Sequence, residues 1–305
     1  MLSAKICGWC DELSSRCLGL LSVKLLRDVW KLRALQALKE GGMGGINMRW
    51  LKRGGALRVA SWIASIRVPH SLLRAARISV NQANPERDAA MRAMIGQYFS
   101  SSASLLEIGS WFGEGSTRIW LDELPSGSDL ILLDRWDSYV SAEDLGKGSA
   151  GYAGMDRFHR PALINTVDVV DAHPRRHEID VSIIRSETRR IGRFLENAAF
   201  DVIYIDGSHY HDDVVADIEF AKKAIKTGFG IICGDDLEIL PDAEVIEHAR
   251  RFKERDFVAY GDRHFHPGVA LAVAEQFGRV NMKDGFWWVF CRNGVFEADG
   301  PDRQV

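Results

Sequence analysis

The sequence is poor in cysteine and lacks any long apolar run. Its five cysteines, an odd and sparse set in 305 residues, do not predict a disulfide framework. No segment reaches the roughly 18–20 uninterrupted apolar residues of a membrane span. The first residues also lack the apolar core and the small-residue cleavage site of a secretory signal. These absences favour a reducing, cytoplasmic setting and leave open an association with a membrane surface.

The cysteines that are present fall into two groups. Cys7-x-x-Cys10 has the spacing of a redox or zinc pair, but the sequence offers no second pair and no preceding strand, so we expect no function for it. Cys233 and Cys291 lie inside apolar runs, and we expect both to be thiols of the protein core.

Charge is distributed unevenly along the chain. Residues 1–80 hold fourteen Lys and Arg against four Asp and Glu, a charge of about +10, and the remainder carries about −13. Two basic amphipathic stretches, 1–40 and 55–80, flank a glycine-rich break at 41–45. Such helices can lie on an anionic membrane surface, bind an acidic partner, or pack as a cap on the rest of the chain. We therefore expect residues 1–80 to form a basic helical N-terminal extension.

From residue 85 the pattern is that of an α/β domain. Apolar residues make up 46% of the chain, which is enough for a full core. A helix is predicted over 85–98, and apolar runs then alternate with helical patterns, as in βαβ units of a parallel sheet. The runs are continuously apolar, which is typical of strands covered on both faces. They cover residues 104–109, 129–134, 181–184, 200–206 and 229–234. We predict a doubly wound, mostly parallel seven-stranded sheet within residues 85–305.

The end of the domain and one internal segment follow other patterns. Residues 257–260 and 286–291 look like later strands, with a helix over 269–277 between them. Residues 137–160, rich in Gly, Ser and Asp, predict a loop of a length that is usually functional or mobile in a compact domain.

Four side chains outside the main motifs are further candidates. Tyr139 and Tyr152 lie on the predicted loop and are candidates for a lid over a bound substrate. His264 and His266 are either substrate-site residues or residues of a surface loop, and the sequence does not choose between these two interpretations.

A glycine-containing turn follows the first predicted strand. In Glu107-x-Gly109-x-x-x-Gly113 the glycines let the backbone adopt φ > 0 and approach a ligand closely. Open α/β sheets bind ligands at such carboxyl ends of strands. A dinucleotide-binding turn would have a glycine in place of Glu107, to cradle a pyrophosphate at the helix N-terminus. A carboxylate repels a pyrophosphate and suits a ligand with a sulfonium and an ammonium group. The alternative is an ordinary strand-to-helix turn.

An acidic residue ends the second predicted strand. Asp134 comes 21 residues after Gly113. A carboxylate in this place can accept hydrogen bonds from both hydroxyls of a ribose. Dinucleotide-binding folds use the same device, so Asp134 indicates a nucleoside without choosing between cofactors.

Two further strands end in acidic residues, Asp206 and the pair Asp235-Asp236. If these strands are central and adjacent, the three carboxylates meet at one edge of the sheet and repel one another unless a cation neutralises them. Oxygen ligands favour Mg²⁺ or Ca²⁺, and such an ion would lower the pKa of a bound hydroxyl. His209, three residues after Asp206, can take the proton. Alternatively, Asp235 and Asp236 cap the next helix and His209 is only hydrogen-bonded.

Together these segments resemble the class I S-adenosylmethionine (SAM)-dependent methyltransferases over roughly residues 85–292. The resemblance implies a Rossmann-like methyltransferase fold. It also implies that the turn meets the methionine part of SAM through Glu107, Gly109, Ser110 and Gly113.

The resemblance assigns the remaining motifs as well. Asp134 matches the acidic ribose ligand, and Ser186 falls where the adenine is usually contacted. The segment from Asp206 to His209, with the later acidic pair, looks like a bacterial branch that includes macrocin-type sugar O-methyltransferases and relatives of cephalosporin hydroxylase. Catechol-type O-methyltransferases carry their metal ligands at the equivalent strand ends. Here these ligands would be Asp206, which also borders the cofactor, and the pair Asp235-Asp236. His209 takes the position of their lysine base.

We therefore expect a SAM-dependent O-methyltransferase that acts on a sugar, glycan or secondary metabolite. The acidic strand ends add the expectation that Mg²⁺ or another divalent cation assists it. Glu107 argues against an NAD-dependent oxidoreductase. A nucleic-acid methyltransferase could use the basic N-terminus, but the body is acidic and no Asn/Asp-Pro-Pro-aromatic signature is present. A non-catalytic SAM-fold scaffold is the remaining alternative, and it would leave the carboxylates unexplained.

Overall fold

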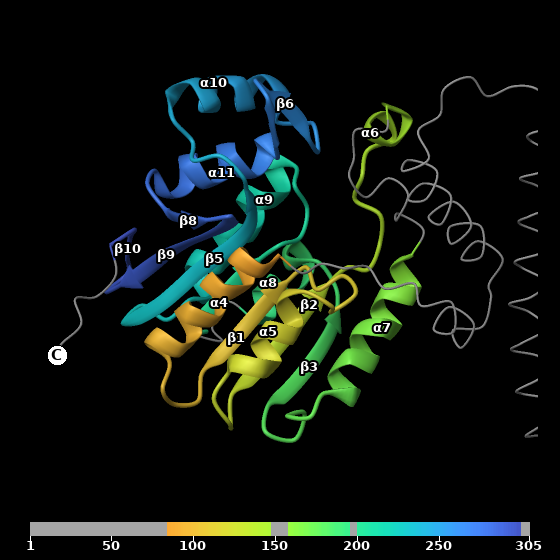
Figure 1. The fold of residues 1–305 in the computed structure, drawn as a ribbon, viewed down its shortest axis with the longest axis vertical. Coiled ribbons are helices and arrows are strands. Elements are labelled where there is room, and N and C mark those ends of the chain that lie inside the picture. The colour runs from red at the N-terminus through yellow and green to blue at the C-terminus, as the bar shows by residue number, and fades with distance from the viewer. Residues whose placement is uncertain (1–83, 148–157, 196–199, 300–305) are drawn as a thin grey trace, which may run out of the picture. The chain divides into compact units, whose positions relative to one another are not determined.

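The computed structural model describes residues 84–147, 158–195 and 200–299 (Figure 1). The expected extension over residues 1–80, the pair Cys7-x-x-Cys10 and Tyr152 lie outside the described residues. Cys233 and Cys291 are buried, as expected.

The described residues form one large sheet with helices on both of its faces. Its strands are β1 (Ser104–Ile108), β2 (Asp129–Asp134), β3 (Asp180–Arg185), β4 (Val202–Ile205), β5 (Phe229–Leu237), β8 (Asn281–Lys283), β9 (Gly285–Arg292) and β10 (Val295–Glu297). The order is β10-β9-β5-β4-β1-β2-β3, and β8 also pairs with β9. Strands β1 to β5 run parallel, whereas the pairings of β9 with β5, β8 and β10 are antiparallel. The predicted doubly wound, mostly parallel fold is confirmed, and the short β8 makes the sheet eight-stranded.

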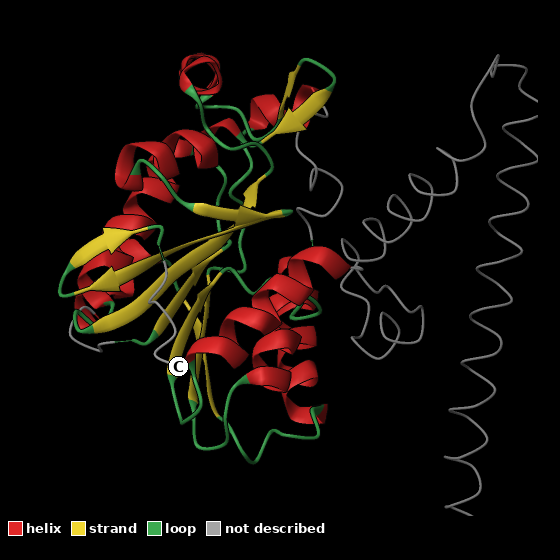
Figure 2. Ribbon diagram, turned by 60° about the vertical axis from the view of Figure 1, so that its left-hand side comes forward, coloured by secondary structure: helices red, strands yellow, loops and turns green. Residues whose placement is uncertain are grey.

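The alternation of side chains along each strand explains why both faces are covered. Leu105 packs in one core with Met91 and Trp120, whereas its neighbour Leu106 packs in the other core with Ile218. Figure 2 shows the helical layers on both sides of the sheet. The first core lies under α4 (Pro85–Tyr98), α5 (Ser116–Glu123) and α7 (His159–Ala172). The second lies under α8 (Thr188–Leu195), α9 (His211–Ala224), α10 (Ala243–Phe252) and α11 (Pro267–Phe277).

Three expectations are corrected by the structure. The predicted loop at 137–160 contains α6 (Ala142–Lys147) and the first residues of α7. The strand expected at 257–260 is present as β6 (Val258–Tyr260), but it pairs with β7 (Arg263–Phe265) in a separate hairpin. β3 is partly exposed, and it is an edge strand among the strands that the structure describes.

The chain reverses the direction in which it adds strands after β3, and this reversal creates a possible ligand-binding site. After β1 the chain builds β2 and β3 on one side, then returns to build β4 and β5 on the other. β1 therefore pairs with both β2 and β4, and the connections diverge at its carboxyl end. Ligands of open α/β sheets bind at such a switch point.

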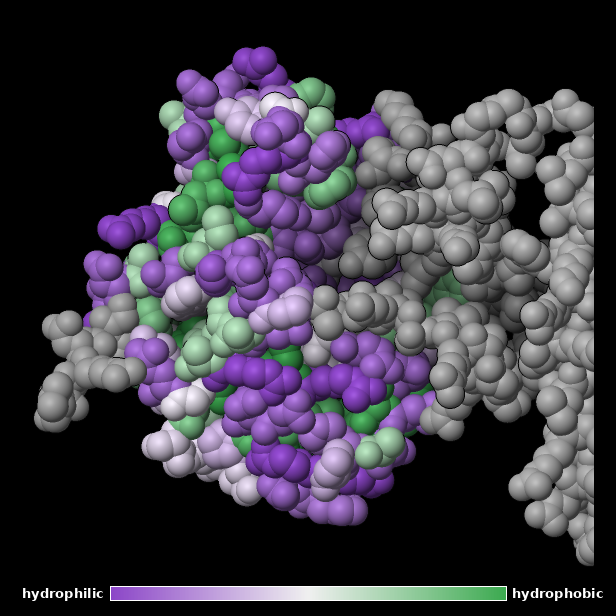
Figure 3. All heavy atoms as spheres, viewed as in Figure 1, coloured by the Kyte–Doolittle hydropathy of each residue, from purple (hydrophilic) through white to green (hydrophobic). Residues whose placement is uncertain are grey.

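The described surface is largely polar. Hydrophilic side chains dominate the face shown in Figure 3. Within residues 84–147, 158–195 and 200–299, no helix has the length and apolar character that a membrane crossing requires.

Gly268 sets how closely α11 packs on the start of α9. A Cβ at Gly268 would lie 2.2 Å from the carbonyl oxygen of His209 and 2.5 Å from the amide nitrogen of His211. Gly268→Ala should therefore lower the free energy of unfolding by about 1–3 kcal/mol, as measured by urea denaturation. The control is Gly96→Ala, at an exposed position of α4 where a Cβ meets nothing within 4 Å. This control should be neutral or stabilising, and equal effects of the two changes would contradict the packing argument.

Candidate functional site

A cavity lies at the switch point, above the carboxyl ends of the parallel strands. It encloses about 1040 Å³, including space that is open to solvent. Its lining includes six residues singled out from the sequence: Gly109, Asp134, Tyr139, Ser186, Asp206 and His209. The topology therefore brings together residues that are up to a hundred positions apart in the chain.

The glycine turn after β1 is shaped by a close contact with β4. Gly109 has φ +91°, and a Cβ there would lie 1.9 Å from the carbonyl oxygen of Asp206. Its amide donates to the carbonyl oxygen of Leu133, 2.8 Å away. Gly113, with φ +69°, packs against Thr166 of α7. Both glycines are thus required by the backbone itself.

Glu107 is directed into the turn and is not part of the cavity lining. Its carboxylate is completely buried and accepts hydrogen bonds from the hydroxyls of Ser110 (3.1 Å), Thr117 (2.6 Å) and Ser116. Burial raises the pKa of Glu107 to about 7, against the effect of these hydroxyl donors. In this structure Glu107 organises the turn, and its direct contact with a cofactor stays a prediction, as does that of Ser110.

Asp134 ties the turn to the end of β2. One of its oxygens accepts from the amides of Ser110 (3.0 Å) and Trp111 (2.8 Å), and the other accepts from the amide of Trp136 (2.6 Å). Burial raises the pKa of Asp134, although these three amides favour its charged form. Next to it, the amide of Ser186 donates to the Asp134 carbonyl oxygen (2.9 Å), which holds the end of β3 at the cavity.

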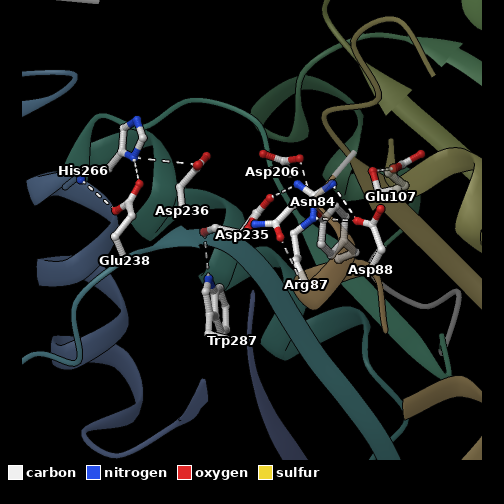
Figure 4. A network of polar contacts seen from close by, with 12 residues as sticks. Asn84, Arg87, Asp88, Glu107, Asp206, Asp235, Asp236, Glu238, His266 and Trp287 are labelled. Carbon is white, nitrogen blue, oxygen red and sulfur yellow. Dashed lines mark hydrogen bonds and ion pairs between the residues drawn. The ribbon is translucent and has the colours of Figure 1, made fainter. Parts of the chain in front are cut away.

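The acidic residues at the ends of β4 and β5 meet as expected, because these strands are adjacent and parallel. They do not converge on one point, however. A register shift interrupts the pairing of β5 with β9 between Gly234 and Leu237, and Asp236 adopts φ +63°. Figure 4 shows the result, with Asp235 turned toward Arg87 and Asp236 toward His266.

Asp235 has a cationic partner that the sequence did not reveal. Arg87, in the first turn of α4, places Nη1 2.5 Å from Asp235 Oδ2 and Nη2 3.0 Å from Asp88 Oδ1. Burial and the charge of Asp236 raise the pKa of Asp235 to about 6, while Arg87 opposes the shift. Burial, followed by the charges of Asp236 and Asp235, also raises the pKa of Asp206 well above its usual value. Asp206 accepts from the hydroxyl of Tyr204 at 3.1 Å.

The three carboxylates therefore do not fit the expected Mg²⁺ site. Asp235 already has a cation in Arg87, and a second cation beside it would be repelled. Of the His, Cys, Asp and Glu side chains in the described part of the chain, one group of three comes close enough for a metal ion, and it is His209, Asp236 and His266. Neither Asp206 nor Asp235 belongs to this group.

His209 lies between two carboxylates. Its Nδ1 is 2.8 Å from Asp256 Oδ1, and its Nε2 is 3.0 Å from Asp236 Oδ2. Burial alone would lower the pKa of His209, but the charges and hydrogen bonds of Asp236 and Asp256 outweigh burial and raise it well above its usual value. A general base needs a free ring nitrogen, and in this arrangement both nitrogens face carboxylates. The base role of His209 stays a prediction that this arrangement does not favour.

Of the other candidate residues from the sequence, two lie at the site and one lies on the surface. The hydroxyl of Tyr139 is 3.3 Å from His209 Nδ1, so this part of the predicted loop reaches the cavity. His266 contacts Glu238 and Asp236, whereas His264 is exposed and stacks on Phe257.

Comparison with known proteins gives one sequence match. Residues 106–237, less than half of the chain, match a family described as a methyltransferase domain. No curated protein matches the chain. The match supports a methyltransferase domain in this part of the chain, and it spans β1 to β5 with the turn and both acidic strand ends.

Solved structures with similar folds share little sequence with the chain. An O-methyltransferase from Bacillus cereus in complex with SAH is 18% identical, covers 75% of this chain and 95% of its own, and has a TM-score of 0.38. The O-methyltransferase TomG from Streptomyces achromogenes, involved in tomaymycin synthesis and in complex with SAM, is 15% identical, covers 78% and 89%, and has a TM-score of 0.43.

The ion pair of Arg87 with Asp235 should be essential to the fold around the site. Both side chains are about nine-tenths buried, so Arg87→Met leaves a buried charge without its partner and should cost about 3–5 kcal/mol in the free energy of unfolding. Adding Asp235→Asn should restore much of this loss in a double-mutant cycle. The matched control is Arg92→Met in the same helix, whose partners are exposed, and it should cost less than about 1 kcal/mol.

Asp217 should make stability depend on pH. It is buried and accepts from the hydroxyl of Thr188, and burial raises its pKa to about 7. The unfolded chain loses this proton near pH 4. Its contribution to stability is therefore complete below about pH 4 and is lost as the pH rises through about 7. Asp217→Asn should match the parent near pH 4 and be more stable at pH 8 in urea denaturation. An equal difference at both pH values would show that folding does not shift the pKa of Asp217.

Proposed function

We propose that this chain is a SAM-dependent methyltransferase that transfers a methyl group to a hydroxyl oxygen. The observation that carries the proposal is the charge of the cavity at the switch point. Its described lining holds more carboxylates than guanidinium groups. The acidic residues are Asp134, Asp137, Glu187, Asp206, Asp213 and Asp217, and the basic ones are Arg135 and Arg189.

This charge selects among nucleoside ligands. A dinucleotide carries a pyrophosphate, which an acidic cavity repels, whereas SAM carries a sulfonium and an ammonium group. Even without Asp206 and Asp217, whose pKa values are raised, four carboxylates remain against two guanidinium groups. The absence of a glycine at the position of Glu107 argues in the same direction. The residues that would hold SAM are Gly109 and Gly113 of the turn, Asp134 at the ribose and Ser186 at the adenine.

The chemistry that SAM supplies is an electrophilic methyl group, and the chain must supply orientation and a place for the proton. Asp206 and His209 line the cavity together. Since both ring nitrogens of His209 face carboxylates, we assign removal of the hydroxyl proton to Asp206 and positioning of the acceptor to His209. Holding the oxygen in line with the methyl group should be the largest contribution to rate.

For the acceptor we propose a hydroxyl of a sugar, glycan or secondary metabolite. The support is the resemblance of the Asp206–His209 segment to the macrocin-type branch. For residues 1–80 we propose contact with an acidic partner or an anionic lipid surface, based on their charge of about +10.

Binding of the methyl donor gives the first test. SAM or its demethylated product SAH, at a hundred times its Kd, should stabilise the protein by about 2.7 kcal/mol, visible as a rise in Tm. Asp134→Ala should weaken the binding at least about tenfold, because it removes both the proposed ribose ligand and the anchor of the turn. The control is Asp129→Ala, at the exposed start of the same strand, which should bind as the parent does.

A methyl-transfer screen gives the second part of this test. Labelled SAM is offered with sugar, phenol and lipid-linked acceptors, and label should move to a hydroxyl-bearing acceptor. Absence of binding of both SAM and SAH to the folded chain would contradict the proposal as a whole. Transfer to a nucleic acid would contradict the proposed acceptor class only.

A further inference from the structure

We propose that His209, Asp236 and His266 bind a divalent transition-metal ion of the zinc type, at a site that does not depend on the proposed methyl transfer. One ligand atom from each of the three lies within 4.8 Å of the others. His209 Nε2 is 3.0 Å from Asp236 Oδ2, and His266 Nδ1 is 3.7 Å from Asp236 Oδ1.

These spacings are close to those that one ion requires. With metal–ligand distances of about 2.0–2.2 Å, neighbouring ligand atoms lie about 3.3–3.6 Å apart in a tetrahedron and about 2.8–3.1 Å apart in an octahedron. The nitrogen–oxygen distance of 3.0 Å lies within the octahedral range, and that of 3.7 Å is slightly longer than the tetrahedral range. Glu238 Oε1 lies 2.7 Å from His266 Nδ1 and could serve as a further oxygen ligand.

The groups behind the site support a ligand role for His209. Asp256 is completely buried, and its Oδ1 is 2.8 Å from His209 Nδ1. A carboxylate that accepts from Nδ1–H leaves the Nε2 lone pair directed at Asp236, which is the arrangement that orients metal-binding histidines in proteins. The other oxygen of Asp256 has no hydrogen-bond partner among the described residues. The backbone amide of His266 donates to Glu238 Oε2 (3.1 Å), which holds the second imidazole.

Three separate segments are brought together at this point. His209 precedes α9, Asp236 lies in the irregular part of β5, and His266 caps the N-terminus of α11. The rings of His209 and His266 are 4.2 Å apart between centroids. Gly268 allows this approach, since any Cβ there would collide with the His209 carbonyl oxygen. A bound ion would therefore crosslink the β5 end to two helices.

The donor set determines the class of ion. Two imidazoles with a carboxylate suit Zn²⁺, Fe²⁺, Co²⁺ or Ni²⁺, whereas Mg²⁺ and Ca²⁺ prefer sites made of oxygen ligands alone. This site therefore differs from the three carboxylates expected from the sequence, of which Asp235 is paired with Arg87. Because His209 also lines the cavity, the ion would lie beside the acceptor end of it.

The test measures metal binding to the full chain, without a polyhistidine tag and in a Cys7→Ser/Cys10→Ser background that removes the other candidate pair. After treatment with a chelator, Zn²⁺ and Mg²⁺ are titrated by calorimetry, and retained metal is measured by mass spectrometry. We expect one equivalent of Zn²⁺ per chain that excess Mg²⁺ does not displace. Co²⁺ in place of Zn²⁺ should give the visible absorption bands of a site with nitrogen and oxygen ligands.

Two variants decide whether the metal is at this site. His266→Ala should weaken Zn²⁺ binding at least about a hundredfold, whereas His264→Ala, two residues away and exposed, should bind as the parent does. Asp256→Asn should weaken binding about 10- to 100-fold, because it removes the group that orients His209. Retention of less than 0.1 equivalent by the parent, or equal binding by the two histidine variants, would overturn the proposal and leave the cluster as an ion-pair network. SAM binding is measured separately, so its failure is distinguishable from failure of the metal site.

Discussion

The contact between β1 and β4 at Gly109 is the constraint on which the site depends. With a would-be Cβ 1.9 Å from the Asp206 carbonyl oxygen, no other residue can occupy position 109 without moving one of the two strands. The contact places the turn and the end of β4 against each other, and Asp134 then fixes the turn from β2 through three backbone amides. The backbone of two strand ends and one turn thus defines this part of the cavity.

The second organising principle is local compensation of charge. Each buried acidic group has its own partner: hydroxyls at Glu107, backbone amides at Asp134, and Arg87 at Asp235. Buried charges are tolerated only when they are paired in this way. The compensation is local, so neighbouring carboxylates behave differently. Burial and the charge of Asp236 raise the pKa of Asp235, against the effect of Arg87. At Asp236 burial is outweighed by the charges of His266 and His209, which lower the pKa.

The sequence predicted the sheet well because its signals are short-range. Continuous apolar runs indicated strands β1, β2, β4 and β5. The alternation of these runs with helical patterns indicated that the strands are parallel. The position of the acidic residues could also be predicted, because the carboxyl ends of adjacent parallel strands lie at the same edge of the sheet. The directions of the acidic side chains could not be predicted from the sequence. A regular strand would leave Asp235 and Asp236 on opposite faces. An irregular step in β5 and a positive φ at Asp236 instead direct the first to Arg87 and the second to the two histidines. Arg87 and Asp256 reach the site from distant segments, and no local pattern marks them.

The backbone conformation of Asp236 carries a cost in stability. With φ +63°, the residue occupies a conformation that glycine adopts freely and that costs other residues on the order of 1 kcal/mol or more. The ion pairs that Asp236 makes with His209 and His266 offset this cost. Asp236→Gly would relieve the backbone strain and at the same time leave buried His209 with one carboxylate partner in place of two. The strained conformation and the histidine contacts are thus two sides of one energy balance at this residue.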